Sequence, residues 1–419
     1  MTAGMGQARK HSESRTLRRG LLCTLAAVGM WTVAIAGVAP AAVAADVQSK
    51  QWYLKAMGAE DIWKSATGKG IKVAVIDTGV NPSTPSLKGQ VLKGLDLSET
   101  KGEATDDYSG HGTTMAELIA GTGKGGGLQG LAPGAKIIPM RISDTGRQNE
   151  QSVNAHDAED AIRAAVDSEA QIINMSFASD YLSPEEIEAV KYAERKGKLF
   201  FAGVGNSAKK GNKPQYPASY PEVVGVAAID SDGRVADYSQ HGDFVDIAAP
   251  GNDIPRWCNT KFESYCDGDG GTSSATAITS ASAALIWSAH PDWTANQVLR
   301  VMFESAAQAE GSKKGTVSNY LGHGVVRPGA HINRGLGKPG DPNLSPLTNK
   351  KTSGSTASPA PSAPASSQGP KGKSGDDAVV AGSSKSTDDG GQLGLIIGIG
   401  AAVVIAVGAF AVIRKRRST

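Results

Sequence analysis

Cysteine is scarce in this chain, and the few cysteines follow no metal-binding pattern. Only three occur in 419 residues, and Cys258 and Cys266 lie eight positions apart without the Cys-x-x-Cys spacing of a zinc site. The sequence therefore excludes a disulfide-rich scaffold and a cysteine-based metal centre. Outside the cytoplasm we expect these two cysteines to form one disulfide. Two free buried thiols are the alternative.

An excess of charge of either sign is also missing. The 43 basic residues nearly balance the 41 acidic residues, which leaves a formal net charge of +2. A protein that attracts nucleic acid or an acidic partner through its overall field needs a larger imbalance. We therefore expect no nucleic-acid partner, and any partner must be recognised by a local surface.

The first 45 residues have the pattern of a signal peptide. Three arginines precede an apolar run over 20–43, and the small residues at its end suit cleavage after Ala44 or Ala45. Cys23 stands at the start of this run, whereas a lipoprotein signal needs its cysteine at the end. We expect the mature chain to begin near Asp46, outside the cytoplasm.

A second apolar segment lies near the C-terminus. Residues 393–413 carry no charge over a length of 21 residues, and a basic tail follows at 414–419. About 20 apolar residues span a bilayer, and a basic flank favours the cytoplasmic side. We expect a single-pass protein of the cell membrane with its bulk outside. A buried core helix is the alternative, which the glycines and the terminal basic cluster disfavour.

The part between these two segments divides by composition. Residues 336–392 are dominated by Pro, Ser, Gly, Ala and Lys and hold too few apolar residues to offset chain entropy, which predicts a disordered linker. Residues 56–335 form the globular part, preceded by a short N-terminal extension at 46–55. Such a short extension cannot build a core of its own, so we expect no folded pro-domain.

Near-continuous apolar runs in the globular part predict buried strands. These runs cover residues 71–76, 136–140, 171–175, 198–202 and 223–227. They suit parallel strands that are covered on both faces, and helical patterns lie between them, over 155–168 and 184–196. The fold class is therefore α/β, with three layers (α/β/α) and a mostly parallel central sheet.

Three short motifs bring chemistry to this fold. Gly270 and Gly271 form a turn that presents Ser273 at the start of a small-residue helix, where the helix end favours developing negative charge. Asp77 ends the first strand, and His111 stands between glycines at the start of another helix. Alone, the serine motif is an ordinary helix cap, the aspartate a turn former and the histidine structural. Together they are the carboxylate, base and nucleophile that acyl transfer needs.

The three motifs resemble those of the subtilisin-like serine proteases, peptidase family S8. Asp77-Thr78-Gly79, His111-Gly112-Thr113 and Gly271-Thr272-Ser273 follow one another in the order Asp, His, Ser. The resemblance implies a subtilisin-like fold over 56–335 and a serine endopeptidase that acts on proteins or peptides. It assigns Ser273 as nucleophile, His111 as general base and acid, and Asp77 as the residue that orients the histidine.

The same resemblance implies the remaining parts of the site. Asn206 follows a glycine in a segment similar to the oxyanion loop of the family, and should donate to the oxyanion. Two uncharged segments resemble the walls of the primary substrate pocket and favour an apolar or small side chain there. Their residues are Ser176, Phe177, Ala178, Gly203, Val204 and Gly205. This mechanism needs no cofactor, and no metal site is expected because the acidic pairs lack the ligand number of a calcium site.

The overall layout resembles the mycosins, which are membrane-anchored subtilases of actinobacterial type VII secretion systems. A signal peptide, a catalytic domain, a Pro/Ser-rich spacer and a terminal membrane helix occur in that order. This resemblance implies that the protein processes secreted substrates and contacts the secretion apparatus.

Four residues depart from the usual subtilase pattern. Thr114, Met115 and Glu117 replace residues that commonly follow the catalytic histidine, and Ala277 stands where a proline is usual after the nucleophile. A carboxylate on a closely packed helix is the most disruptive of these changes. They leave open a second hypothesis, in which the protein is a weakly active or non-cleaving scaffold component of a secretion complex.

Overall fold

The computed structural model describes residues 44–142, 158–268, 270–313 and 315–352. Its centre is a seven-stranded sheet with the strand order β2-β3-β1-β4-β5-β6-β7, and every pairing in this sheet is parallel. The strands are β1 (Lys72–Asp77), β2 (Leu95–Asp96), β3 (Lys136–Arg141), β4 (Ile172–Met175), β5 (Leu199–Gly203), β6 (Val224–Ile229) and β7 (Ile247–Pro250). The predicted parallel sheet is confirmed.

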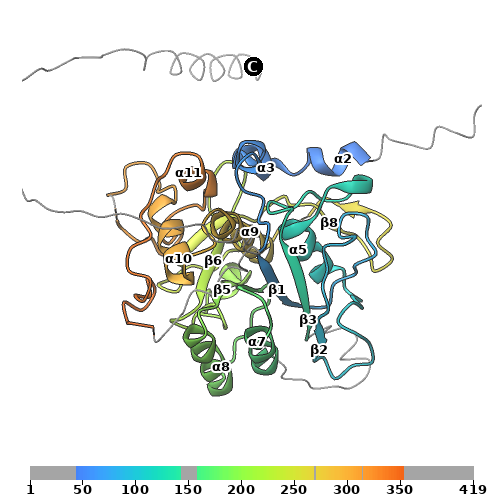
Figure 1. The fold of residues 1–419 in the computed structure, drawn as a ribbon, viewed down its shortest axis with the longest axis horizontal. Helices are drawn as coiled ribbons and strands as arrows, with labels where there is room; N and C mark the ends of the chain where they lie inside the picture. The colour runs from blue at the N-terminus through green and yellow to red at the C-terminus, as the bar shows by residue number, and fades with distance from the viewer. Residues whose placement is uncertain (1–43, 143–157, 269, 314, 353–419) are drawn as a thin grey trace, which may run out of the picture. The chain divides into compact units, whose positions relative to one another are not determined.

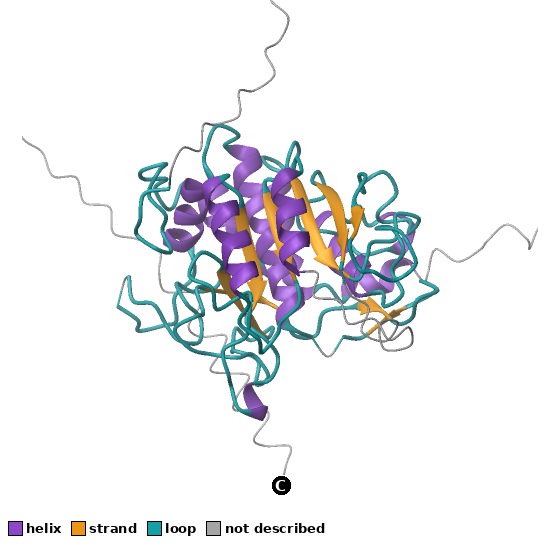
Figure 2. Cartoon of the chain, turned by 90° about the horizontal axis from the view of Figure 1, so that it is seen from below, coloured by secondary structure: helices purple, strands orange, loops and turns teal. Residues whose placement is uncertain are grey.

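Helices cover both faces of this sheet, as Figure 1 and Figure 2 show. On one face lie α7 (Ala158–Asp167) and α8 (Pro184–Arg195). The other face carries α5 (His111–Ala120), α9 (Thr272–Ala289) and α10 (Ala295–Ser305), together with the short helices α2 (Ala44–Ser49), α3 (Trp52–Ala56), α4 (Ala59–Trp63) and α11 (Pro328–Ile332). The three-layer α/β/α architecture is therefore present as predicted.

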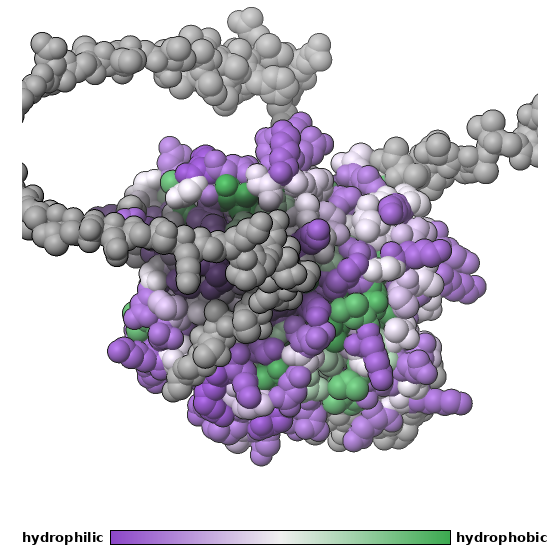
Figure 3. Space-filling model, in the orientation of Figure 1, coloured by the Kyte–Doolittle hydropathy of each residue, from purple (hydrophilic) through white to green (hydrophobic). Residues whose placement is uncertain are grey.

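The alternation along β1 explains the three layers. Val73 and Val75 belong to the hydrophobic cluster shared with α5 and α9, whereas Ala74 and Ile76 belong to the cluster shared with α7 and α8. Successive strand residues point to opposite faces, so a strand that is apolar throughout must be covered on both. Hydrophilic residues predominate on the face drawn in Figure 3, where hydrophobic residues form separate patches.

Helix α9 runs through the centre of its layer and is nearly all buried. Alanine, serine and threonine fill most of its length, which lets the helix approach β4, β5, β6 and β7 closely. Ala277 is fully buried within it. The absence of proline there therefore preserves a continuous helix behind Ser273.

The segments on either side of the globular part also pack against it. In the N-terminal extension, Gln51 exchanges two hydrogen bonds of 2.8 Å with the backbone of Gln129, and Tyr53 is fully buried. Beyond residue 335, the carbonyl of Pro342 accepts from Thr294 and that of Leu344 accepts from Arg300, both on or next to α10. Described contacts therefore continue past the predicted start of the linker at 336, as far as Thr352, whose Oγ1 accepts from the Asn296 side chain.

Several predicted segments lie outside the described residues. These are most of the signal peptide, the linker from 353 to 392, the apolar run at 393–413 and the basic tail at 414–419. Among the helices of the described ranges, none combines the length and the apolar character that a membrane crossing requires.

Candidate active site

Asp77, His111 and Ser273 come from three elements that end or begin at the same edge of the sheet. Asp77 is the last residue of β1, His111 the first of α5, and Ser273 the second of α9. The carboxyl ends of parallel strands gather ligand and catalytic groups in open α/β sheets. The structure thus brings together residues that are separated by up to 196 positions of sequence.

Glycines allow this convergence. A Cβ atom at Gly112 would lie 2.2 Å from the carbonyl oxygen of Gly79, so a larger residue would push α5 away from β1. Gly270 has a φ of +83°, and a Cβ there would lie 2.4 Å from the carbonyl oxygen of Gly251. Glycine alone tolerates both the backbone angle and the close approach. These two positions fix the starts of the helices that carry His111 and Ser273.

Asp77 and His111 form a short hydrogen bond. The Oδ1 atom of Asp77 lies 2.7 Å from Nδ1 of His111 and also accepts from the backbone amide of Thr78 at 2.8 Å. The Asp77 side chain is 3% exposed and that of His111 is 37% exposed. A buried carboxylate on Nδ1 orients the ring and directs Nε2 away from it.

The environment raises the pKa of His111 above its ordinary value of 6.5. Burial lowers this pKa, but the charge and hydrogen bond of Asp77, with a smaller contribution from Asp107, outweigh the effect of burial. The Arg256 guanidinium acts in the opposite direction and lowers it. A ring with a raised pKa is a better proton acceptor, as a general base requires.

Asp107 supports this pair and was not predicted as a site residue. Its Oδ1 accepts from Thr78 Oγ1 at 2.8 Å and from the amide of Gly110 at 2.8 Å, while its Oδ2 accepts from Thr113 Oγ1 at 2.6 Å. It thereby ties the loop after β1 to the start of α5. The only signal in the sequence was an acidic residue four positions before the histidine, which is a common feature of helix starts.

The Ser273 hydroxyl faces the same pocket as His111 but has another partner. It donates to the backbone carbonyl of Ser176 at 3.1 Å, and no hydrogen bond joins it to His111 in this arrangement. To act as a nucleophile, the hydroxyl would have to exchange the Ser176 carbonyl for His111 as its hydrogen-bond acceptor. Catalytic hydrogen bonds are often loose before substrate binds.

Asn206 stands beside Ser273 with its amide nitrogen available. Its Oδ1 accepts from the backbone amide of Thr272 at 2.9 Å and from Thr272 Oγ1 at 3.1 Å. Because the oxygen is engaged in this way, the NH2 group is the part of the side chain left to donate. Asn206 and Ser273 line the same pocket.

The two predicted pocket walls flank the start of α9. Ser176 Oγ donates to the carbonyl of Ser273 at 3.2 Å, and the amide of Gly205 donates to Thr272 Oγ1 at 3.3 Å. Ala178 is exposed and Phe177 is partly buried, whereas Val204 is fully buried in the core on the α7 and α8 side. Val204 therefore contributes only its backbone to the predicted wall of the primary substrate pocket.

A pocket of about 290 Å³ holds the candidate base, nucleophile and oxyanion donor. His111, Asn206 and Ser273 lie on it, together with Met115 from α5 and Arg256 and Trp257 from a short hairpin. The hairpin consists of β8 (Arg256–Trp257) and β9 (Tyr265–Cys266), which pair in antiparallel fashion. The disulfide between Cys258 and Cys266 lies within it.

Two of the residues that depart from the subtilase pattern hold this hairpin. Thr114 Oγ1 accepts from the backbone amide of Trp257 at 3.2 Å. Glu117 is fully buried and accepts from Tyr265 at 2.8 Å and from Thr84 at 2.8 Å. The departures on α5 thus form the surface on which the hairpin docks.

We predict that Glu117 makes stability depend on pH. Burial raises its pKa from 4.5 to about 7, so the folded state holds a proton that the unfolded chain releases. The free energy of unfolding should therefore fall by on the order of 3 kcal/mol as the pH rises from about 4.5 to about 7. Glu117→Gln removes this ionisation and should be more stable than the parent at pH 8. Urea unfolding at pH 5.5 and pH 8, in a Ser273→Ala background that prevents self-digestion, measures the difference.

Asp246 does not affect the difference in pH dependence between the parent and Glu117→Gln. Burial also raises its pKa to about 7, but it is present in both proteins and its contribution cancels. Equal changes in unfolding free energy with pH in the parent and in Glu117→Gln would contradict the prediction.

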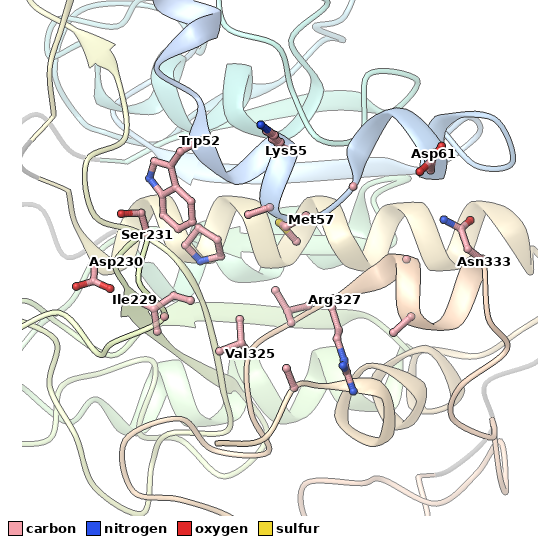
Figure 4. Close-up of a pocket in the computed structure, with 18 of the residues that line it drawn as sticks. Trp52, Lys55, Met57, Asp61, Ile229, Asp230, Ser231, Val325, Arg327 and Asn333 are labelled. Carbon is pink, nitrogen blue, oxygen red and sulfur yellow. The ribbon is translucent and has the colours of Figure 1, made fainter. Parts of the chain in front are cut away.

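A separate pocket of about 500 Å³ shares no lining residue with the candidate active site. Figure 4 shows Trp52 and Met57 on one side of it and Ile229, Val325 and Arg327 on the other. The Trp52 indole donates to the carbonyl of Asn252 at 3.0 Å. Within the described ranges, no group of three or more His, Cys, Asp or Glu side chains is arranged to hold a metal ion.

Comparison with known proteins identifies the protein family to which the chain belongs. Residues 68–324 match the subtilase family of peptidase S8, and the chain belongs to this family of serine proteases. It is 33% identical over 219 residues to the major intracellular serine protease of Bacillus subtilis, covering 50% of this chain and 67% of that protein. It is 36% identical over 228 residues to the thermophilic serine proteinase of Bacillus sp. AK1, about half of each chain (54%).

Solved structures of two mycosin proteases resemble this chain. MycP1 from Mycobacterium smegmatis superposes with a TM-score of 0.60 at 25% identity, over 71% of this chain and 88% of that chain. The MycP3 protease from the type VII (ESX-3) secretion system superposes with a TM-score of 0.55 at 29% identity, over 67% of this chain and 88% of that chain. The fold is thus subtilisin-like, and mycosin proteases are among its structural neighbours.

Proposed function

We propose that the protein is a membrane-tethered serine endopeptidase that uses Asp77, His111 and Ser273. The observation that carries the proposal is the 2.7 Å bond between Asp77 and His111 beside the pocket that His111 shares with Ser273 and Asn206. This is the arrangement of orienting carboxylate, base, nucleophile and oxyanion donor that acyl transfer requires.

The proposed reaction begins when the Ser273 hydroxyl turns from Ser176 toward His111. Nε2 of His111 takes the proton as Ser273 Oγ attacks the scissile carbonyl, and Asp77 stabilises the resulting imidazolium. The oxyanion receives hydrogen bonds from the Asn206 amide and from the backbone amide of Ser273. His111 then returns its proton to the leaving amine, and water hydrolyses the acyl-enzyme by the same steps.

The primary substrate pocket is proposed to lie between 176–178 and 203–205. No charged side chain occurs in either segment, and the buried Val204 leaves backbone on the second wall. Extended peptide would add to an exposed backbone edge of this kind by β-augmentation. An apolar or small residue before the scissile bond fits these uncharged walls.

We place the enzyme outside the cytoplasm, anchored to the cell membrane by 393–413. The support is the sequence pattern of signal peptide, linker, apolar segment and basic tail, together with the disulfide. One solved structure that resembles this chain is described as an essential component of the type VII (ESX-1) secretion system, with 30% identity over 70% of this chain. We extend this context to the chain and propose that it processes substrates of such a system.

The residues at 46–55 are proposed to remain part of the mature enzyme. Gln51 is 2% exposed and Tyr53 is fully buried, and the Gln48 amide donates to the carbonyls of Gly123 and Gly127. Removal of this extension would uncover these partners.

A non-cleaving scaffold is the second candidate, favoured by one observation. The Ser273 hydroxyl is engaged with Ser176 and not with His111. Incubation of the full-length protein with a peptide library separates the two. An enzyme yields products with small or apolar residues before the cut, whereas a scaffold yields no products beyond those of Ser273→Ala.

A further inference from the structure

The active-site pocket is lined by other residues than the proposed primary walls. None of the residues 176–178 or 203–205 lines it, whereas His111 and the β8–β9 hairpin do. Substrate residues before the scissile bond would follow the primary walls. The residues after the bond must therefore leave on the side of His111, which protonates the departing amine. This pocket is accordingly in position to contact the leaving part of the substrate.

Arg256 gives this pocket a positive charge. Among the residues that line it, Arg256 is the only one with a permanent charge, and none of them is acidic. Its side chain is exposed, and in the part of the chain that the structure describes no carboxylate forms an ion pair with it. Its charge reaches the catalytic region, because it lowers the pKa of His111. A guanidinium offers five donors in a planar fork that matches a carboxylate.

The backbone of Arg256 lies in a hairpin that is held by contacts with α5. The neighbouring Trp257 is 6% exposed, stacks on Tyr265 with ring centroids 3.8 Å apart, and is bonded through its amide to Thr114. Tyr265 is bonded in turn to the buried Glu117, and Cys266 pairs with Arg256 across the hairpin. The backbone of Arg256 is therefore fixed before substrate arrives, which reduces the entropy lost on binding.

The geometry points to Arg256 as a specificity-determining residue for the leaving side. It would select substrates that carry a carboxylate, from Asp or Glu, at the first or second position after the scissile bond. This inference rests on the proposed function. It adds a charge preference to the side of the cleft opposite the uncharged primary walls.

The test compares peptides that differ in a single side chain. Internally quenched peptides carry Glu, Gln or Lys at the first or second position after one common scissile bond, and kcat/KM is measured with the full-length protein. We expect the Glu peptide to be cleaved about tenfold faster than the Gln peptide, as a partly exposed charge-assisted contact allows, and the Lys peptide more slowly. This preference should shrink as salt is added.

Arg256→Gln should abolish the preference, measured as the ratio of kcat/KM for the Glu and Gln peptides within that variant, so that any change in the environment of His111 cancels. Arg256→Glu should invert this ratio. Arg195→Gln removes an exposed arginine of α8 and serves as the matched control, which should retain the parent preference. Equal Glu-to-Gln ratios in the parent and in Arg256→Gln would overturn the inference alone. Failure of the parent to cleave any peptide would overturn the proposed function, and this inference with it.

Discussion

Replacing Ser273 by alanine should lower kcat about a million-fold while the protein stays folded. Nucleophile and base act as a unit, so loss of the nucleophile costs as much as loss of the whole triad, as in a related subtilisin. Alanine is a good helix former and fits the second position of α9, so the helix should remain intact. The measurement is hydrolysis of a peptide identified in the library, with the unfolding transition as the control for folding.

The Ser273→Ala protein should keep a small residual activity. The oxyanion donors and substrate binding should leave a rate above that of water alone. A Ser273→Ala protein with more than about a hundredth of the parent kcat would assign the nucleophile to another residue.

Replacing Asn206 by alanine should lower kcat by about 100- to 1000-fold. The side chain would lose a hydrogen bond to charge that develops only in the transition state, so KM should change little. Steady-state kinetics on the same peptide separates the two constants.

Asn206→Asp tests whether activity depends on the NH2 group of Asn206 or on the bond between its Oδ1 and Thr272. Aspartate keeps the oxygen that accepts from Thr272 but has no NH2 group. If Asn206 is the oxyanion donor, Asp should lose as much activity as Ala or more. Retention of activity in Asn206→Asp would show that the contact with Thr272 is what counts.

Strand interiors and the positions of the three motifs could be read from the sequence because their signals are local. The apolar run that became β1 needed only its own residues, and Asp77 follows it directly. His111 and Ser273 were marked by flanking glycines, whose role in the close approach of helix to strand is now visible at Gly112 and Gly270. The prediction of these side chains as one site rests on their positions at strand and helix ends.

The support of the site could not be predicted in the same way. Asp107 is one of many acidic residues at a helix start, and only its contacts with Thr78 and Thr113 distinguish it. Strand β7 was missed because it is four residues long and ends in proline. Composition also does not report that the backbone carbonyls of Pro342 and Leu344 find hydrogen-bond donors on or next to α10.

The residues that departed from the subtilase pattern illustrate the same limit. Glu117 looked disruptive because a buried carboxylate is costly without partners. The structure supplies them from Thr84 and Tyr265, which are 33 and 148 positions away. Arg256 carried no signal at all, because its position beside His111 arises from the packing of the hairpin on α5.

The most direct test of the central claim is covalent labelling of the nucleophile. A fluorophosphonate probe reacts with a serine that an adjacent base activates, and mass spectrometry locates the modified residue. We predict labelling of the full-length protein at Ser273, abolished in Ser273→Ala and strongly reduced in His111→Ala. A folded protein that takes up no label, or takes it up equally well without His111, would contradict the claim that Asp77, His111 and Ser273 act as a catalytic triad.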